Sequence, residues 1–375
     1  MKLAYIANIR LPTEKAHGYQ IMRVCSEWAR MGHSVTLFVP MRNNPITVDA
    51  FEYYGVPRHF AIEYVPCKNW MSMVRVFGRM AFFAQSLSFL RAAVAHIPEG
   101  SVVYTRDLEA VWYLSRQGLS CIYNAHNWPR KSALAARLIA SAKGVVCNSK
   151  GTQSVVQAAA KLPTVVAYNA SDSNPYAGQD KQQLRKELGL PPDTNIALYS
   201  GHLYGWKGAD TLLQCARLCE QHPQCLFVAI GGTKEDIQRL QEETIGMRNI
   251  SFLGHQPKSM VPKFLAAADV LLLPNTRTTA ESVSFTSPLK MFEYMASGTP
   301  IVASDLPSLR EILSDDVAYF SEAGNAKSLA DSVARVLAHP DEAAQKARAA
   351  LAASTHYTWD AHAKSVIVFI QSVTA

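Results

Sequence analysis

Short runs of mainly hydrophobic residues, without a regular alternation of polar ones, recur along this 375-residue chain. Residues 35–39 (VTLFV) form one such run. Successive side chains of a strand point to opposite faces, so both faces of this strand must be buried. Strands of this kind belong to parallel sheets that helices cover on both sides, and helical stretches separate most of the runs. The pattern predicts an α/β protein with parallel sheets.

The predicted strands fall into two series, which suits a chain long enough for two cores. Residues 171–193 lie between the series and are polar and rich in Pro, Gly and Asp, which predicts a linker with one short helix. We expect doubly wound domains at residues 1–170 and 194–355 and a final helix at 356–375. The predicted strands are residues 2–8, 35–39, 61–65, 101–105, 121–125, 144–148 and 164–168, then 195–200, 225–230, 250–253, 269–274 and 300–304.

The amino-acid composition indicates which kinds of partner the chain binds and in which compartment we expect it. The net charge of +7 suits an anionic ligand or membrane surface. No nucleic-acid recognition motif or dense Lys/Arg block accompanies it, so we expect no nucleic acid partner. We also expect no secretory signal and no membrane-spanning helix, because the apolar runs are short. The seven scattered cysteines predict free thiols in a reducing cytoplasm.

Four potential metal ligands lie close together in the sequence, at Cys215, Cys219, His222 and Cys225. A zinc site is one interpretation. Helix-packing cysteines are the favoured one, because no paired C-x-x-C knuckle is present.

A glycine-bearing loop, residues 201–208 (GHLYGWKG), follows the predicted strand 195–200 and precedes a helical stretch. Gly201 and Gly208 would let the backbone approach a phosphate, and Lys207 and the helix N-terminus would add positive potential. An ordinary tight turn with a solvated lysine fits the spacing equally well.

Residues 287–298 (SPLKMFEYMASG) predict a helix with Ser287 as N-cap and Pro288 in the first helical position. Lys290 falls in the first turn, where a cation opposes the helix dipole unless an anion binds there. Glu293 lies three residues on, on the same face, where its carboxylate could accept hydrogen bonds from ribose hydroxyls. A weak Lys290–Glu293 surface pair is the alternative.

With these residues the chain resembles the group 1 retaining glycosyltransferases, which have the GT-B fold. Gly201, Lys207 and Gly208 match the donor motif G-R-x-x-x-x-K-G of that family, with His202 in place of the arginine. In the family's second motif, two glutamates are separated by seven residues and a small-residue turn and strand follow.

This second motif matches at Glu293 and the following SGTPIVASD segment. Its first glutamate is replaced by Phe285, and the nearby Glu281 is out of register. The two departures, at His202 and Phe285, affect positions that would bind the diphosphate and recognise the donor sugar.

The resemblance implies two Rossmann-like domains that face a central cleft, with the final helix packed back on the N-terminal, acceptor-binding domain. It implies that the donor binds at Gly201, His202, Lys207, Gly208, Ser287, Leu289, Lys290 and Glu293. It implies catalytic roles for His126, Lys207 and Glu293. It implies acceptor contacts at His17, Gly18 and Arg106, with the donor phosphates as the alternative partner of His17. Without the family, a capping or core role is the simpler interpretation of His126.

The activity implied is transfer of a hexose-type sugar, with retention, from a nucleotide diphosphate sugar to a glycan or lipid-linked acceptor in cell-envelope synthesis. No metal or other cofactor is implied, because the donor's β-phosphate would deprotonate the acceptor while lysines stabilise the leaving diphosphate. A nucleotide-sugar epimerase and an inactive sugar- or nucleotide-binding protein are the alternatives.

Residues 68–98 contain no acidic side chain and mix arginines with large apolar residues. This mixture indicates either a helix that packs inward or reversible contact with an anionic membrane at the cytoplasmic face. The basic residues are Lys68, Arg75, Arg79 and Arg91, and the apolar ones are Trp70, Met71, Met73, Phe77, Met80, Phe82, Phe83 and Phe89.

Overall fold

The computed structural model describes residues 1–68, 70, 74–128, 132–220 and 225–374. It consists of two compact units. The first unit contains Met1–Tyr168 and Trp359–Ala375, and the second unit contains Asn169–Thr358.

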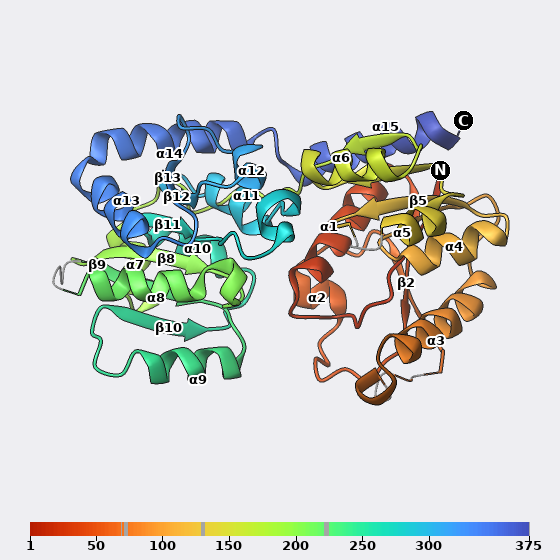
Figure 1. The fold of residues 1–375 in the computed structure, drawn as a ribbon, viewed down its shortest axis with the longest axis horizontal. Coiled ribbons are helices and arrows are strands. Elements are labelled where there is room, and N and C mark those ends of the chain that lie inside the picture. Colours follow the sequence, from red (N-terminus) through yellow and green to blue (C-terminus); the bar gives the residue numbers. More distant parts are fainter. Residues whose placement is uncertain (69, 71–73, 129–131, 221–224, 375) are drawn as a thin grey trace. The chain divides into compact units, whose positions relative to one another are not determined.

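The first unit contains a seven-stranded parallel sheet with the strand order β3-β2-β1-β4-β5-β6-β7. Helices lie on both of its faces (Figure 1). The strands are β1 (Lys2–Ile6), β2 (Ser34–Pro40), β3 (Ala61–Val65), β4 (Val102–Thr105), β5 (Ser120–Ala125), β6 (Gly144–Cys147) and β7 (Thr164–Val166). The helices are α1 (Ala16–Arg30), α2 (Ala50–Tyr54), α3 (Val74–Val94), α4 (Leu108–Arg116), α5 (Ser132–Ile139), α6 (Lys150–Ala159) and α15 (Trp359–Thr374).

The second unit contains a six-stranded parallel sheet with the strand order β10-β9-β8-β11-β12-β13. The strands are β8 (Asn195–Ser200), β9 (Cys225–Ile230), β10 (Ile250–Gly254), β11 (Val270–Leu273), β12 (Ile301–Ser304) and β13 (Tyr319–Ser321). The helices are α7 (Lys181–Leu188), α8 (Ala209–Leu218), α9 (Lys234–Glu243), α10 (Val261–Ala267), α11 (Leu289–Met295), α12 (Pro307–Arg310), α13 (Ala326–Ala338) and α14 (Pro340–Ser354). Two further turns are the 3-10 helix η2 (Gly205–Lys207) and the π-helix η3 (Glu281–Phe285).

Both sheets confirm the predicted α/β class with two Rossmann-like units. All four residues of β4 are buried, as are all four of β11 and all four of β12. The sequences of these strands are mainly hydrophobic, as expected for strands that are covered on both faces. The strand order reverses between β1 and β4 in the first sheet and between β8 and β11 in the second. Doubly wound sheets bind ligands at such reversal points.

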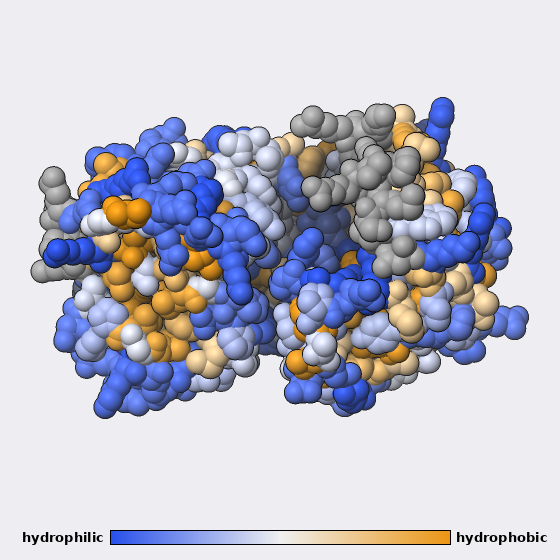
Figure 2. Space-filling view, turned by 90° about the horizontal axis from the view of Figure 1, so that it is seen from below, coloured by the Kyte–Doolittle hydropathy of each residue, from blue (hydrophilic) through white to orange (hydrophobic). Residues whose placement is uncertain are grey.

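Strand β10 departs from this pattern because it forms one edge of its sheet. Each of its five residues is partly exposed. Hydrophobic side chains are visible on this side of the second unit (Figure 2). The edge strand has a neighbouring strand on one side only, so its burial is incomplete. Strand β13, at the other edge, is only three residues long and was not among the predicted strands.

Residues 171–193 do not form the predicted linker, because they belong to the second unit. Helix α7 buries Leu184 and Arg185. The Arg185 guanidinium donates to the carbonyl oxygens of Ala267 (2.9 Å) and Pro192 (2.9 Å) and pairs with the Asp269 carboxylate at 2.5 Å. These contacts fix the segment to the sheet. The polar composition of residues 171–193 suggested a linker, but the polar Arg185 is buried and donates hydrogen bonds within the second unit.

Helix α15, at the end of the chain, belongs to the first unit. It lies against α1, where the fully buried Trp28 donates its indole N–H to the Ala363 carbonyl at 3.3 Å. Tyr19 on α1 also meets Trp359 edge-on, with ring centroids 6.0 Å apart. The helix thus supplies side chains, among them His362, to a unit that is otherwise built from residues almost 200 positions earlier.

The cysteines of the second unit pack into its interior. Cys215 and Cys225 are buried members of the hydrophobic core, and Cys219 packs against it. The fourth member of the suggested zinc group, His222, lies outside the described residues. All seven cysteines are free thiols. Within the described part of the chain, no helix is long and apolar enough to cross a membrane.

The role of Arg185 yields a stability prediction. We expect Arg185→Met to lower the free energy of unfolding of the second unit by about 3–5 kcal/mol, because it breaks the ion pair with Asp269 and removes the donor from several buried carbonyl groups. Lys186→Met, at an exposed position of the same helix, is the matched control and should change stability by less than about 0.5 kcal/mol. Urea denaturation measures both. Equal, small effects would contradict the assignment of residues 171–193 to the second unit.

Candidate functional site

The glycine-bearing loop lies at the carboxyl end of β8, beside the reversal point of the second sheet. Gly201 leaves the strand with φ +126°, and η2 and Gly208 (φ +86°) lead into α8. A side chain at Gly208 would overlap the Pro274 carbonyl oxygen, which would be 1.8 Å from a Cβ atom. A Cβ at Gly231, after β9, would be 2.5 Å from the Gly201 oxygen. Three loops therefore pack backbone to backbone, which only glycine permits here.

Lys290 brings its ammonium group to this loop from α11. Its Nζ lies 3.9 Å from the centroid of the Tyr199 ring, and its side chain lies beside Gly201. The Nζ atom is buried and has no hydrogen-bond partner among the residues the structure describes. Lys207 lies nearby, with its Nζ 5.3 Å from the Tyr204 ring and 5.2 Å from the Trp206 ring. Aromatic faces rather than carboxylates therefore surround the two ammonium groups.

The charges of these lysines are poorly compensated. Burial lowers the pKa of Lys290 well below its ordinary value, and the neighbouring Lys207 lowers it further, while Glu293 opposes the shift. Burial also lowers the pKa of Lys207, and the exposed Glu281 opposes that shift. Two mutually repelling cations next to a tight glycine loop form a site for a strong anion, such as a diphosphate.

Glu281 and Phe285 both belong to the π-helical turn η3. Sequence spacing placed Glu281 out of register, yet its charge acts on Lys207. The structure thus provides a carboxylate near the lysines, but from a different position in the chain.

Glu293 has a partner that the sequence did not indicate. Its carboxylate forms an ion pair with Lys258, which lies between β10 and α10, and its side chain is 17% exposed. Glu293 is thus not paired with Lys290 in a surface bridge. Its position next to a partly exposed lysine leaves it able to accept hydrogen bonds from a ligand hydroxyl.

Ser287 does not cap the helix that follows, contrary to the prediction. Helix α11 begins at Leu289, its N-cap is Pro288, and no side chain caps it. Ser287 is buried, and its hydroxyl accepts the Asn169 backbone N–H at 3.3 Å while its carbonyl accepts the Asn169 side-chain amide. The serine is therefore held within the fold of the second unit, and proline in the extended conformation precedes the helix.

His202 stacks on a neighbouring ring, with its centroid 5.1 Å from that of Tyr204 and an interplanar angle of 2°. Its carbonyl accepts the Tyr199 hydroxyl at 2.6 Å. These contacts fix the loop at the point where the family has arginine.

The predicted residues of the first unit gather at its own reversal point. His17 follows β1, Arg106 follows β4 and His126 follows β5, and these three strands are neighbours. Arg106 Nε donates to the Tyr5 hydroxyl at 3.2 Å. Burial lowers the pKa of His126 well below its ordinary value, and Arg106 is the next cause. Burial and Arg106 likewise lower the pKa of His17 to about 4.

Two further features of this group were not visible in the sequence. His362 on α15 is buried, and its charge would act on His126. Gly18 is required by a tyrosine rather than by a ligand. A Cβ there would be 2.1 Å from the Tyr54 hydroxyl, which accepts the Thr13 N–H and donates to the Thr13 carbonyl, both at 2.7 Å.

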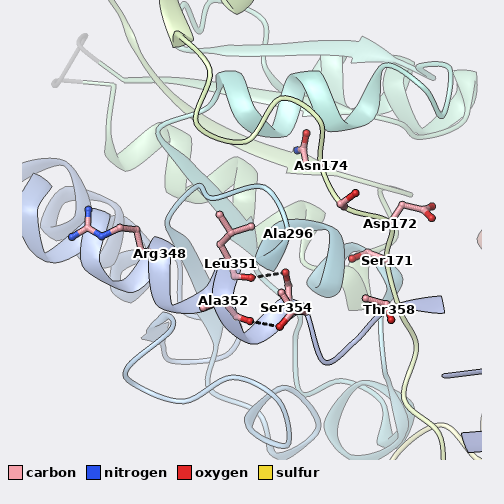
Figure 3. A pocket seen from close by; sticks show the side chains of 11 residues that line it. Ser171, Asp172, Asn174, Ala296, Arg348, Leu351, Ala352, Ser354 and Thr358 are labelled. Carbon is pink, nitrogen blue, oxygen red and sulfur yellow. Dashed lines mark hydrogen bonds between the residues drawn. The ribbon is translucent and has the colours of Figure 1, made fainter. Parts of the chain in front are cut away.

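A pocket of about 440 Å³ lies elsewhere in the second unit (Figure 3). It is formed by residues 171–174, the end of α14 and Ala296, which follows the C-terminal end of α11. Lys290 lies at the opposite end of that helix, and none of the predicted site residues lines the pocket. Across the described ranges, no three His, Cys, Asp or Glu side chains lie close enough together to hold a metal ion.

Comparison with known proteins supports the resemblance. Residues 180–352 match the family model described as "Glycosyl transferases group 1". A putative teichuronic acid biosynthesis glycosyltransferase, TuaC of Bacillus subtilis, is 26% identical over 157 residues, 42% of this chain and 36% of that protein. A D-inositol 3-phosphate glycosyltransferase of Mycobacterium leprae is 27% identical over 206 residues, 52% and 46% of the two chains. The matches thus span less than half of either relative.

The fold has close counterparts among solved structures. The crystal structure of Anabaena HepE in complex with UDP and glucose aligns with a TM-score of 0.77 at 19% identity. The alignment covers 99% of this chain and all of HepE. The expected GT-B fold is confirmed.

The Nζ atom of Lys290 is buried without a hydrogen-bond partner among the described residues. Replacing this lysine should therefore have opposite effects on stability and on ligand binding. Lys290→Met should raise the free energy of unfolding of the ligand-free protein by about 1–3 kcal/mol, because it removes a buried donor without a partner. It should also weaken nucleoside diphosphate binding at least about tenfold. Calorimetry measures both quantities. Lys258→Met is the control, since it breaks the ion pair with Glu293 and should not stabilise the protein. A Lys290→Met protein that is less stable and binds normally would contradict this role.

Proposed function

Because residues 180–352 match the family model of group 1 glycosyl transferases, we propose that the chain transfers a sugar from a nucleoside diphosphate donor to an acceptor hydroxyl. The observation that carries the proposal is the buried ammonium of Lys290, beside Lys207 and the glycine loop. A diphosphate would supply the counter-charge that these lysines lack. HepE, which shares the fold, has been crystallised with UDP and with UDP-glucose, which favours UDP as a first donor base to test.

The proposed reaction proceeds with retention at the anomeric carbon and without a metal. The bond between that carbon and the β-phosphate oxygen breaks, and the acceptor oxygen forms the new bond on the same face. The hydroxyl proton passes to the departing phosphate. Lys207 and Lys290 stabilise the charge that develops on the diphosphate, where a buried, preorganised environment makes such contacts strong.

The other residues take supporting roles in this proposal. The backbone at Gly201, Gly208 and Leu289 approaches the diphosphate. Glu293 accepts hydrogen bonds from hydroxyls of the donor, with Lys258 holding its carboxylate in place. His126 places the transferred sugar.

The acceptor is proposed to be a glycan or a lipid-linked glycan, and the transferred sugar a hexose. The two relatives bear names that refer to teichuronic acid and to D-inositol 3-phosphate. Names that refer to such different molecules support glycosyl transfer in general and do not select one acceptor.

Transfer should depend on both donor-site residues. We expect Lys207→Ala and Glu293→Ala each to lower the rate of transfer at least about 100-fold while leaving the unfolding transition intact. Release of nucleoside diphosphate and transfer to acceptor are measured together, so that an epimerase, which needs no acceptor, is recognised. Lys234→Ala and Glu242→Ala, at exposed positions of the same unit, are the controls. Wild-type turnover by either variant would contradict the mechanism.

The proposed reaction uses no metal, so EDTA should not change the rate of transfer. A loss of activity with EDTA that magnesium or manganese restores would contradict this part of the mechanism.

The proposed membrane contact is narrower than residues 68–98. Helix α3 has non-helical backbone at Gly78, and beyond it Phe89 and Leu90 are buried in the core of the first unit. Met80 is 80% exposed and Phe83 39% exposed. The contact is therefore proposed for the part of α3 around Met80. Met71 and Met73 lie outside the described residues, as do the side chains of Arg75, Phe77 and Arg79.

Co-sedimentation with liposomes tests this contact. The full chain should bind vesicles of phosphatidylcholine and phosphatidylglycerol at low salt and be released at high salt, because each cation contributes only about 1 kcal/mol. Replacing Arg75 and Arg79 by glutamate should abolish binding. The same change at Arg335 and Arg348 of the second unit is the control. Failure to bind at low salt, or indifference to the first pair, would exclude the contact.

A further inference from the structure

Arg106 and His126 follow the neighbouring strands β4 and β5, and His17 lies in the first turn of α1, after β1, at the point where the strand order reverses. Buried His362 on α15 joins them, since its charge would act on His126. We call these four residues the first-unit cluster. The position is where a doubly wound sheet binds its ligand.

The cluster contains polar atoms whose partners are missing. Arg106 Nη2, His126 Nε2 and His362 Nε2 are buried, and none of them has a hydrogen-bond partner in the described part of the chain. The same side chains are otherwise fixed. Arg106 Nε donates to the Tyr5 hydroxyl at 3.2 Å, and His362 Nδ1 donates to the Tyr168 carbonyl at 2.7 Å. Buried polar atoms are rarely left unpaired, so three in one place indicate a ligand.

The four side chains are all cationic or able to become so. After burial, the Arg106 guanidinium is the next cause that lowers the pKa of His126 and of His17. It also lowers the pKa of His362, which burial brings to about 4 although the bond to Tyr168 opposes the shift. The histidines are therefore held neutral. An anion would reverse these effects and turn His362 Nε2 into a donor.

The nearest carboxylates do not supply this anion. Glu14 precedes His17 but pairs with Arg10. Asp107 follows Arg106 and accepts the Asn8 backbone N–H at 2.9 Å. Burial raises the pKa of Asp107 to about 6, and its charge is not among the causes that shift the pKa of His126, His17 or His362.

We propose that the first-unit cluster binds an anionic group of the acceptor, a phosphate or a carboxylate. The inference rests on the proposed function and on the acceptor-binding role that the family resemblance implies for the first unit. Arg106 makes the principal contact through its unpaired Nη2, and His362 contributes its Nε2 atom. A neutral acceptor would leave these atoms unpaired, so the cluster selects for charge.

Titration calorimetry with the full chain tests the proposal. Lys207→Met and Lys290→Met are combined as a background that removes anion binding at the donor site. The probes are inorganic phosphate, glucose 6-phosphate, glucuronate and neutral glucose. We expect inorganic phosphate to bind, and glucose 6-phosphate or glucuronate to bind at least about tenfold more tightly than glucose. Comparison of these two probes shows which anion the cluster prefers.

Arg106→Met in this background should abolish phosphate binding and the preference for charged sugars. Arg106→Lys retains the charge but not the second guanidinium nitrogen, so it should weaken binding by several-fold. Thermal unfolding shows whether the Arg106→Met variant folds. If it does not, the Arg106→Lys variant provides the test. Arg58→Met, at an exposed position of the same unit, is the control and should bind as the background does.

Three outcomes would overturn the proposal. One is that neither inorganic phosphate nor a charged sugar binds. Another is that charged and neutral sugars bind equally. The third is that, in a chain with Lys207 and Lys290 intact, Arg106→Met weakens UDP binding as much as it weakens phosphate binding, which would assign the cluster to the donor. Failure of the wild-type chain to bind any of UDP, GDP and ADP would instead contradict the proposed function, and the phosphate titration would still report on the cluster.

Discussion

The parallel direction of the strands is the constraint on which both candidate sites depend. In a parallel sheet every strand ends at the same edge, so loops far apart in the sequence meet there. In the second unit this brings Gly231 against Gly201 and Pro274 against Gly208, because the loops that carry them follow β9, β8 and β11. In the first unit it brings Arg106 and His126 together after β4 and β5. Chemistry is thus concentrated at one edge of each sheet, and the hydrophobic strands provide the rigid support.

Close packing at this edge has a consequence for charge. The loops of the second unit approach so closely that Gly208 has no room for a side chain beside the Pro274 carbonyl. The same closeness buries the ends of long side chains that reach the loop from other elements, as it does for Lys290. Burial and the neighbouring Lys207 destabilise the charged form of this lysine more than Glu293 stabilises it. A ligand-free site of this kind is held in place by the rest of the fold, and it gains most from an anion.

The sequence predicted what local pattern determines. Continuous apolar runs located twelve of the strands, and glycine spacing located the loop with Lys207, because strand burial and tight turns restrict residue type at each position. Long-range partners were not predictable. Lys258 meets Glu293 across 35 residues, and Asp269 meets Arg185 across 84. Nothing near either residue signals such a pair, and a polar segment such as 171–193 resembles a linker until its partners are known. His362 was invisible for the same reason.

The two candidate sites share one electrostatic pattern, although they occur on different sheets. Each places cationic groups at a strand reversal point and leaves some of their buried polar atoms without a hydrogen-bond partner among the described residues. A fold under selection for stability alone would pair or remove such groups, since an unpaired buried donor is unfavourable and apolar replacements are readily accommodated. Their retention in both units is easier to explain if anionic ligands complete the pairing. A transferase whose donor is a diphosphate and whose acceptor carries its own charge would need one such site for each substrate.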